Sequence, residues 1–238
     1  MCTSAILQDR PTEKPKRLLL LLATQNADKA PKPAALEQRL AMMEIFADEL
    51  LQAVAHPDMI YETEGLEDGE IVVDVGVTKE ARFVDKMRAL EQYWDYTYLD
   101  PEGARKPMEQ VHLTGFDTLI RLLDIRYYPP DHNLRPLEGL FEKHRVRVTR
   151  RTDDAWGGRE AQDEYMSRIK DGDREDEGGK REWAEKIKLV EGRKEGEEVV
   201  SSTKVREAAK ARDERALKRL VSDGVAQWIL DEKLYLES

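Results

Sequence analysis

The chain has 238 residues, enough for one large domain or two small ones, and 40% of them are hydrophobic, which is sufficient for a core. Charged residues make up 37%, which predicts a highly charged surface or a charged insertion. The net charge of −10 argues against broad binding to nucleic acid or to an anionic membrane, because both select a basic face. The single cysteine, Cys2, forms no intrachain disulfide and no cysteine-built zinc site, so we expect a cytoplasmic or nuclear location or both.

The first part of the chain predicts a tail, a strand and a helix. Residues 1–16 predict a disordered tail, and residues 17–24 form a continuous apolar run. The run is far shorter than the roughly 20 residues of a membrane span, and it fits a strand buried on both faces of a parallel sheet. A charged, proline-containing lead precedes it, unlike a secretory signal. Residues 33–55 place apolar side chains on one helical stripe and predict an amphipathic helix.

Strand and helix patterns then alternate along the chain, which predicts an α/β fold. We expect a Rossmann-like parallel sheet with helices on both faces. The predicted strands are 71–78, 110–114, 146–149 and 187–190, and the predicted helices are 80–96, 115–123, 203–211, 214–221 and 223–234.

The composition changes in one segment between the last two predicted strands. Residues 152–186 are polar, mixed in charge and glycine-bearing, so they predict a charged mobile insertion. We expect the remainder of 17–238 to form a single domain.

The stretch "VVSSTKVR" (199–206) combines small hydroxyl residues with the start of a helix. A hydroxyl side chain caps a helix by accepting a hydrogen bond from a free backbone N–H, and the remaining free N–H groups favour an anion. A planar guanidinium in the first turn binds phosphate oxygens in bidentate fashion. Ser202, Thr203 and Arg206 therefore suit either a polyphosphate site or an ordinary capped helix with a solvated arginine.

The stretch "VHLTGFDTLIRLL" (111–123) stands at the end of a predicted parallel strand. Ligands of open parallel sheets lie beyond the carboxyl ends of the strands. Gly115 would allow a ligand close to the backbone, and Asp117 would accept hydrogen bonds from ribose hydroxyls. The alternative is a tight turn at Gly115 with Asp117 as a helix-capping or first-turn carboxylate.

Other candidate groups carry weaker signals. Lys29 lies in the polar loop after the first predicted strand and suits a phosphate, although such a lysine is commonly just solvated. The four histidines are not spaced as metal ligands, so we predict no metal site built from protein side chains, and no catalytic residue is identified.

Three segments, in their order along the chain, resemble the nicotinamide/nicotinate mononucleotide adenylyltransferases of the nucleotidyltransferase superfamily; they are described below from the C-terminal one to the N-terminal one. "VSSTKVR", with the tail "ALKRLVSDGVAQWILDEKLY", looks like the family's Ile-Ser-Ser-Thr-x-x-Arg motif and ending. "LTGFDTLIRLLDIRYY" is similar to its Gly-x-Asp-x-Leu segment with a following aromatic, a position that Tyr127 or Tyr128 would fill. "ATQNADKAPKPAALEQRLAMMEI" resembles its lysine-bearing segment, with Lys29 as the nearest match. The resemblance is closest to a divergent fungal branch.

The family's opening strand and its Gly-Ser-Phe-Asn-Pro-x-Thr-x-x-His segment have no counterpart in residues 1–16. We therefore expect a sheet without the family's first strand and helix, and without the histidine that stabilises the ATP phosphates.

The resemblance implies adenylyl transfer from ATP, with Mg²⁺, to nicotinamide or nicotinate mononucleotide, giving NAD or its analogue and pyrophosphate. Ser202, Thr203 and Arg206 would hold phosphates, Gly115 and Asp117 ribose, and Lys29 with Tyr127 or Tyr128 the mononucleotide. Two alternatives stay open: a nucleotide-binding or interaction module without turnover, which the absent histidine segment favours, and a cytidylyltransferase-like enzyme. The expected partners are ATP and the mononucleotide, with no nucleic acid and no membrane, and a homo-oligomer is left open.

Overall fold

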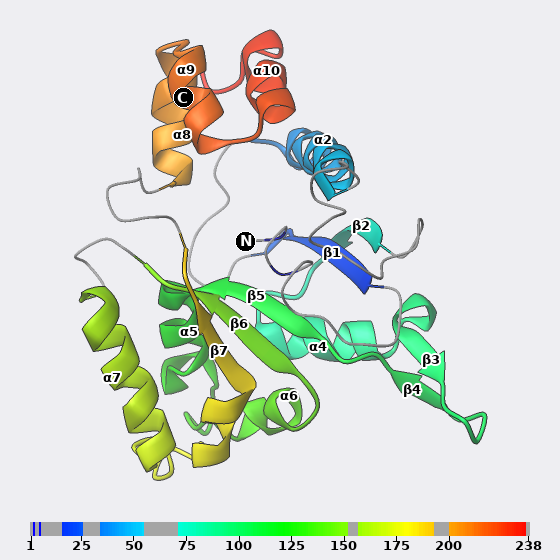
Figure 1. Ribbon diagram of the computed structural model, residues 1–238, viewed down its shortest axis with the longest axis vertical. Helices are drawn as coiled ribbons and strands as arrows, with labels where there is room; N and C mark the ends of the chain where they lie inside the picture. Colours follow the sequence, from blue (N-terminus) through cyan, green and yellow to red (C-terminus); the bar gives the residue numbers. More distant parts are fainter. Residues whose placement is uncertain are drawn as a thin grey trace. The chain divides into compact units, whose positions relative to one another are not determined.

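The structure is a computed structural model that describes residues 2, 5, 16–25, 34–54, 71–151, 157–192 and 200–236. It divides into two compact units, one spanning Glu80–Glu197 and the other joining Cys2–Lys79 to Glu198–Ser238. Each unit contains parallel strands flanked by helices, so the predicted α/β class is confirmed (Figure 1). Each unit is a compact body of its own. A single domain over 17–238 stays a prediction.

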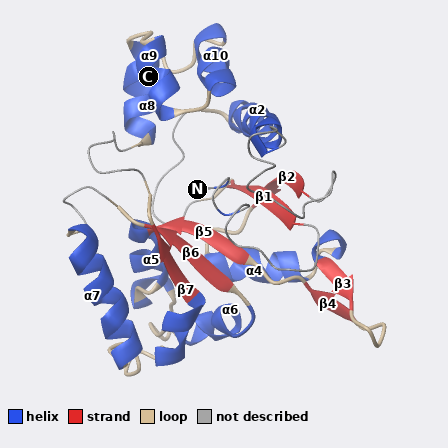
Figure 2. Cartoon of the chain, viewed as in Figure 1, coloured by secondary structure: helices blue, strands red, loops and turns tan. Residues whose placement is uncertain are grey.

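The unit that contains both chain ends begins with two strands. β1 (Lys16–Ala23) pairs in parallel with β2 (Ile71–Thr78), with Leu20 opposite Val75 (Figure 2). α2 (Leu36–Val54) follows β1 and buries Ala47 and Leu50. These three elements confirm the predictions for 17–24, 33–55 and 71–78 to within three residues at each end.

The C-terminal helices of the same unit share a second apolar cluster. They are α8 (Ser202–Lys210), α9 (Glu214–Leu220) and α10 (Asp223–Asp231). Leu217 and Ala226 are fully buried there, and Ile45 and Phe46 of α2 pack against the cluster. The Glu49 carboxylate of α2 accepts hydrogen bonds from the Ser222 hydroxyl and, at 2.7 Å, from the Gly224 N–H. A carboxylate from α2 therefore caps the start of α10.

The other unit is built on a three-stranded parallel sheet in the order β5, β6, β7. Val146 and Val148 of β6 are fully buried, and Ile187 of β7 lies beside Val146 in the register. These side chains belong to the main core cluster, together with Leu119 of the helix after β5. The elements of the sheet and its helices are α4 (Phe83–Glu91), η2 (Trp94–Tyr96), β5 (Val111–Gly115), α5 (Phe116–Leu122), η3 (Ile125–Tyr127), η4 (Arg135–Leu137), α6 (Glu138–Lys143), β6 (Arg145–Thr149), α7 (Gly158–Asp171), η6 (Arg181–Lys186) and β7 (Ile187–Val190).

A short hairpin was missed by the sequence analysis. The helix predicted over 80–96 ends at Glu91, and β3 (Thr97–Leu99) then pairs antiparallel with β4 (Arg105–Pro107). Strands of three residues are too short to show a reliable alternation of apolar and polar residues.

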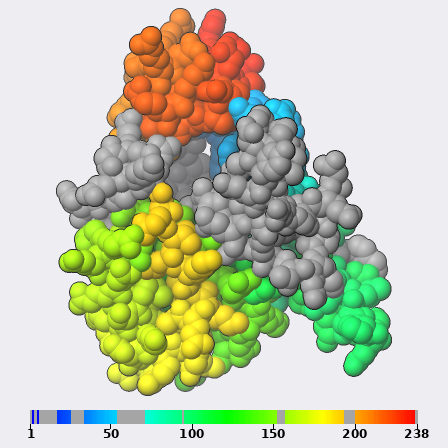
Figure 3. All heavy atoms as spheres, viewed as in Figure 1, coloured from blue at the N-terminus to red at the C-terminus, as the bar shows by residue number. Residues whose placement is uncertain are grey.

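The mobility of the charged insertion over 152–186 stays a prediction, but its described part, 157–186, forms secondary structure with core contacts that the sequence analysis did not predict. α7 occupies 158–171, and its Ile169 is 2% exposed. Trp183 of η6 is 4% exposed and stacks on Phe141 with ring centroids 4.8 Å apart. Figure 3 shows η6 and β7, in yellow, beside the yellow-green surface of α7. The segment is charged on its outer side, but its inner side belongs to the core.

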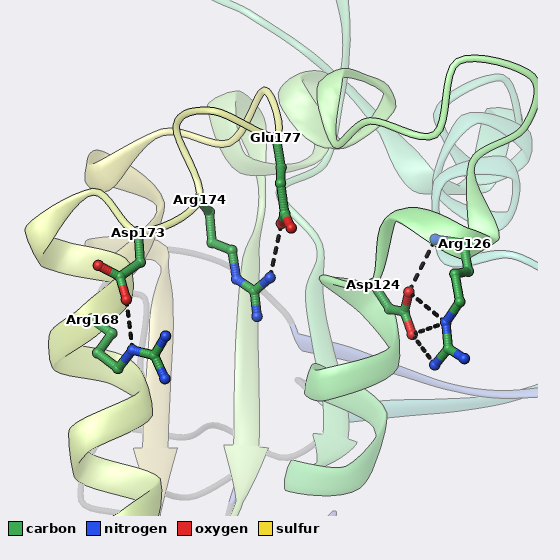
Figure 4. Close-up of polar contacts among 6 residues, drawn as sticks. All are labelled: Asp124, Arg126, Arg168, Asp173, Arg174 and Glu177. Atoms are coloured by element: carbon green, nitrogen blue, oxygen red, sulfur yellow. Dashed lines mark hydrogen bonds and ion pairs between the residues drawn. The ribbon is translucent and has the colours of Figure 1, made fainter.

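The loop between α7 and η6 is held by paired charges. Arg168 donates to Asp173 at 2.6 Å, and Arg174 donates to Glu177 at 2.8 Å (Figure 4). Gly172 and Gly178 adopt φ values of +98° and +86°, which side chains disfavour, so glycine lets the loop turn twice. The charges that suggested mobility are thus partners of one another.

Among the helices that the structure describes, none combines the length and the apolar character of a membrane span.

The half-buried histidine of β5, His112, predicts loss of stability in acid. The His112 ring lies 5.8 Å from Phe83 and 6.3 Å from His144, and burial, with the nearby His144 and Lys86, lowers its pKa from 6.5 to about 4. The unfolded imidazole therefore binds protons between pH 6.5 and 4 that the folded one does not. Folding stability from this group is complete above pH 6.5 and falls, by roughly 3 kcal/mol, as the pH drops towards 4.

Urea unfolding at a series of pH values measures this effect. His112→Leu is expected to reduce the acid-side slope, and a residual slope remains because burial also lowers the pKa of His144. The exposed His132→Leu is the matched control and should leave the slope of the wild type. Equal slopes in wild type and His112→Leu would contradict the prediction.

The carboxylate cap of α10 predicts a second stability change. Glu49→Ala removes the acceptor for the Ser222 hydroxyl and the Gly224 N–H, and losing a helix cap costs about 0.5–2 kcal/mol. The free energy of unfolding is measured in urea against Glu44→Ala, an exposed glutamate of the same helix. Equal losses in the two variants would show that the cap contributes nothing.

Candidate functional site

The three parallel strands of the Glu80–Glu197 unit end level with one another. Gly115 of β5 is opposite Thr149 of β6, and Thr149 is opposite Val190 of β7. Ligands of open parallel sheets lie at this edge. The residues that immediately follow the three strands are therefore the candidates for binding.

Gly115 and Asp117 lie together at this edge, as the sequence predicted. Gly115 is the N-cap of α5 with φ of −88°, so its conformation needs no glycine. A Cβ at Gly115, however, would lie 2.7 Å from Oδ1 of Asp117. The Asp117 side chain is in the first turn of α5 and 24% exposed. Gly115 thus provides the space in which the Asp117 carboxylate sits close to the strand end.

Two further residues at this edge were missed by the sequence analysis. Arg151 follows β6, and its Nη1 lies 3.8 Å from Oδ1 of Asp117. Gln162 of α7 is fully buried and bonds to the Arg151 backbone, donating to the carbonyl oxygen at 2.7 Å and accepting from the N–H at 3.2 Å. A signal for Gln162 exists in the sequence, because Gln162, Tyr165, Met166 and Ile169 follow the helical spacing i, i+3, i+4, i+7.

Arg150 is the centre of an ionic network at the same edge. Its Nη2 lies 2.5 Å from Oδ1 of Asp163, and its Nε lies 3.4 Å from Oε1 of Glu191. Glu191 also pairs with Arg159. The network ties the start of α7 to the residue after β7, and it places several guanidinium groups beside carboxylates at the carboxyl edge.

The two candidate tyrosines lie beyond the other end of α5. Seven helical residues, about 10 Å, separate Gly115 from η3. Tyr128 is 4% exposed and donates its hydroxyl to the Leu122 carbonyl oxygen at 2.6 Å, and burial raises its pKa above the ordinary value. Tyr127 is half-buried. Tyr128 is thus a core residue, which leaves Tyr127 as the more accessible ring.

The Ser-Ser-Thr-Lys-Val-Arg stretch belongs to the other unit, and its first serine caps α8. The Ser201 Oγ accepts a hydrogen bond from the Lys204 N–H at 3.2 Å. Ser202 and Thr203 are exposed, and Arg206 donates from Nη2 to the Thr203 Oγ1 at 3.3 Å. Because Ser201 serves as the cap, the Ser202 and Thr203 hydroxyls remain at the surface of the helix start.

A second arginine of this unit, Arg39, acts electrostatically on the same tyrosine as Arg206. Burial raises the pKa of Tyr235, while the positive charges of Arg206 and Arg39 oppose that rise. Arg39 also donates from Nη2 to the carbonyl oxygen of Ala23, the last residue of β1, at 3.3 Å. Arg39 was not selected by the sequence analysis, because an arginine in the first turns of an amphipathic helix commonly lies in solvent.

Lys29 lies outside the described residues. Within the described ranges, no three His, Cys, Asp or Glu side chains gather as a metal site.

A comparison with curated proteins finds one clear relative. A protein of Schizosaccharomyces pombe, provisionally named a nicotinamide mononucleotide adenylyltransferase, is 32% identical over 209 residues, covering 87% of this chain and 71% of its own length. No protein-family model matches the chain, and no solved structure matches it.

This similarity covers 87% of the chain, and with the observed fold it places the chain in the nucleotidyltransferase class of α/β enzymes. Within that class, the chain belongs to the nicotinamide mononucleotide adenylyltransferase family.

The space beside Asp117 predicts opposite effects for two glycine substitutions. Gly115→Ala places a methyl group 2.7 Å from the Asp117 carboxylate, so we expect the free energy of unfolding to fall by about 1 kcal/mol. Gly139→Ala in α6 places its methyl in open space. Alanine in a helix is expected to raise the free energy of unfolding by about 0.5–1 kcal/mol relative to glycine. Urea unfolding measures both, and a stabilising Gly115→Ala would show that the close contact with Asp117 does not matter.

Proposed function

We propose that the protein transfers the adenylyl group of ATP to nicotinamide or nicotinate mononucleotide. The observation that carries the proposal is the 32% identity over 209 residues to the S. pombe protein provisionally named for this activity. The position of Gly115 and Asp117 at the carboxyl end of a parallel strand supports it, because nucleotides bind at that edge.

The proposed reaction is a displacement at phosphorus. An oxygen of the mononucleotide phosphate attacks the α-phosphorus of ATP, the bond from that phosphorus to the bridging oxygen breaks, and pyrophosphate leaves. Positioning and charge neutralisation supply most of the catalysis in such reactions. The chain therefore needs donors and cations for the phosphates and acceptors for the ribose hydroxyls, and it needs no covalent nucleophile.

We assign these roles to the residues of the two candidate groups. Asp117 accepts from ribose hydroxyls in the space left by Gly115. The exposed hydroxyls of Ser202 and Thr203 and the guanidinium of Arg206 bind the ATP phosphates at the start of α8.

The mononucleotide is assigned to the remaining candidates. Tyr127 stacks on its ring in preference to Tyr128, whose hydroxyl is engaged in the core. Lys29 is assigned to the mononucleotide, as the resemblance in sequence implies.

Mg²⁺ fits the proposal as a partner of ATP. Within the described ranges no carboxylate or histidine cluster suits a metal, and Mg²⁺ in nucleotide sites is held largely by phosphate oxygens and water. Bound in this way, the ion neutralises charge that develops on the phosphates.

We also propose a cytoplasmic or nuclear location.

Synthesis of the dinucleotide tests the proposal directly. The purified 238-residue chain is incubated with ATP, Mg²⁺ and either mononucleotide, and the dinucleotide and pyrophosphate are quantified by chromatography. We expect equal amounts of both products. Arg206→Ala is expected to lower kcat by about 10²–10³-fold, because a principal phosphate-stabilising group is lost. Arg215→Ala, an exposed arginine of α9, is the control and should keep the wild-type rate.

The other outcomes separate the alternatives. ATP binding that is lost in Arg206→Ala, without any dinucleotide, would favour a binding module. Product formed from CTP in preference to ATP would favour a cytidylyltransferase-like enzyme.

A further inference from the structure

In the part of the chain that the structure describes, both hydrogen bonds of the fully buried Gln162 side-chain amide are made with one residue. Its two hydrogen bonds go to the backbone N–H and carbonyl oxygen of Arg151, at 3.2 and 2.7 Å. Buried polar side chains need such partners. Both bonds to a single residue fix the position and the direction of that residue's backbone.

These bonds lie just beyond the end of β6, which is at Thr149. The Arg150 N–H still donates to the carbonyl oxygen of Val190 at 3.0 Å, in continuation of the ladder between β6 and β7. At Arg151 the side-chain amide of Gln162 takes the place of a neighbouring strand. The chain therefore leaves β6 in a direction that α7 determines.

The direction in which Arg151 leaves the sheet matters for Asp117. The Arg151 Nη1 lies 3.8 Å from Oδ1 of Asp117, and the two side chains are 32% and 24% exposed. A guanidinium at this distance attracts the carboxylate and limits its orientations. The same Oδ1 atom also lies close to the strand end, where a Cβ at Gly115 would be 2.7 Å away.

We infer that Gln162 is a positioning residue, which holds Arg151 so that its guanidinium orients the Asp117 carboxylate for the ribose of a nucleotide substrate. The inference rests on the proposed function for the identity of the ligand. The contacts from Gln162 to Arg151 and from Arg151 to Asp117 exist without the ligand.

A cycle of variants in the ligand-free chain tests these contacts. Gln162→Met removes the two hydrogen bonds at similar volume, and Asp117→Asn removes the charge that Arg151 meets. If the three residues act together, the fall in Tm of the double variant differs from the sum of the two single falls by about 2 °C or more. Additive falls would overturn the inference.

The matched control is Gln110→Met. Gln110 also donates its side-chain amide to a backbone carbonyl oxygen, that of Met87 at 3.2 Å, but it lies at the amino end of β5. Its fall in Tm is expected to add to that of Asp117→Asn. If Gln162→Met does not fold, Arg151→Met replaces it in the cycle, and additivity with Asp117→Asn again overturns the inference.

Kinetics of dinucleotide synthesis distinguish positioning from a purely structural role. Gln162→Met is expected to raise the KM for ATP or for the mononucleotide, whichever ribose Asp117 holds, by about fivefold or more, with kcat changed by less than about threefold. A structural defect would instead reduce the active fraction, which lowers kcat at unchanged KM, and that pattern would overturn the inference. A wild type that makes no dinucleotide would overturn the proposed function, and the Tm cycle would then decide the inference alone.

Discussion

The parallel pairing of β5 with β6 sets Gly115 level with Thr149, and the candidate site of this unit depends on that register. A shift of one residue would move every side chain of β5 to the opposite face and would separate Asp117 from Arg151. The register is fixed by burial, since Val146 and Val148 must both face the core. The core thus decides which residues stand at the carboxyl edge.

The charged side chains contribute to this architecture mainly by fixing the conformation of loops. Most of the ion pairs are substantially exposed, such as Arg168 with Asp173, and each exposed pair stabilises the fold by about 0–1 kcal/mol at most. Their effect is to fix loops, as in the turn that follows α7 (Figure 4). Arg150 is different, because its side chain is only 11% exposed and it pairs with both Asp163 and Glu191. A broken Arg150 network would leave a partly buried charge without its partners, which costs more than a surface pair returns.

The sequence predicted the long apolar elements well and the charged ones poorly. The apolar runs of β1 and β2 and the spacing within α2 are strong signals, and Gly115 with Asp117 was found because the strand before them was found. The average charge of 152–186 hid α7, since burial depends on one face of a helix and composition counts all faces. Gln162 lies on that buried face, but an amide is normally counted as a surface residue. Its role depends on two hydrogen bonds to a residue 11 positions away, which no local pattern encodes.

The buried face of α7 links the stability of the core to the geometry of the site. Ile169 belongs to the core cluster, with Tyr165 and Met166 packed against it, and Gln162 continues the same stripe to the carboxyl edge of the sheet. Close-packed interiors transmit small displacements, so a shift of α7 at Ile169 moves the amide that holds Arg151. The orientation of Asp117 is therefore set by core packing, which acts through Gln162 and Arg151, and by the space that Gly115 leaves beside the carboxylate. A carboxylate held in this way loses little freedom when a ligand binds, which is the advantage of placing a binding residue on a rigid sheet edge.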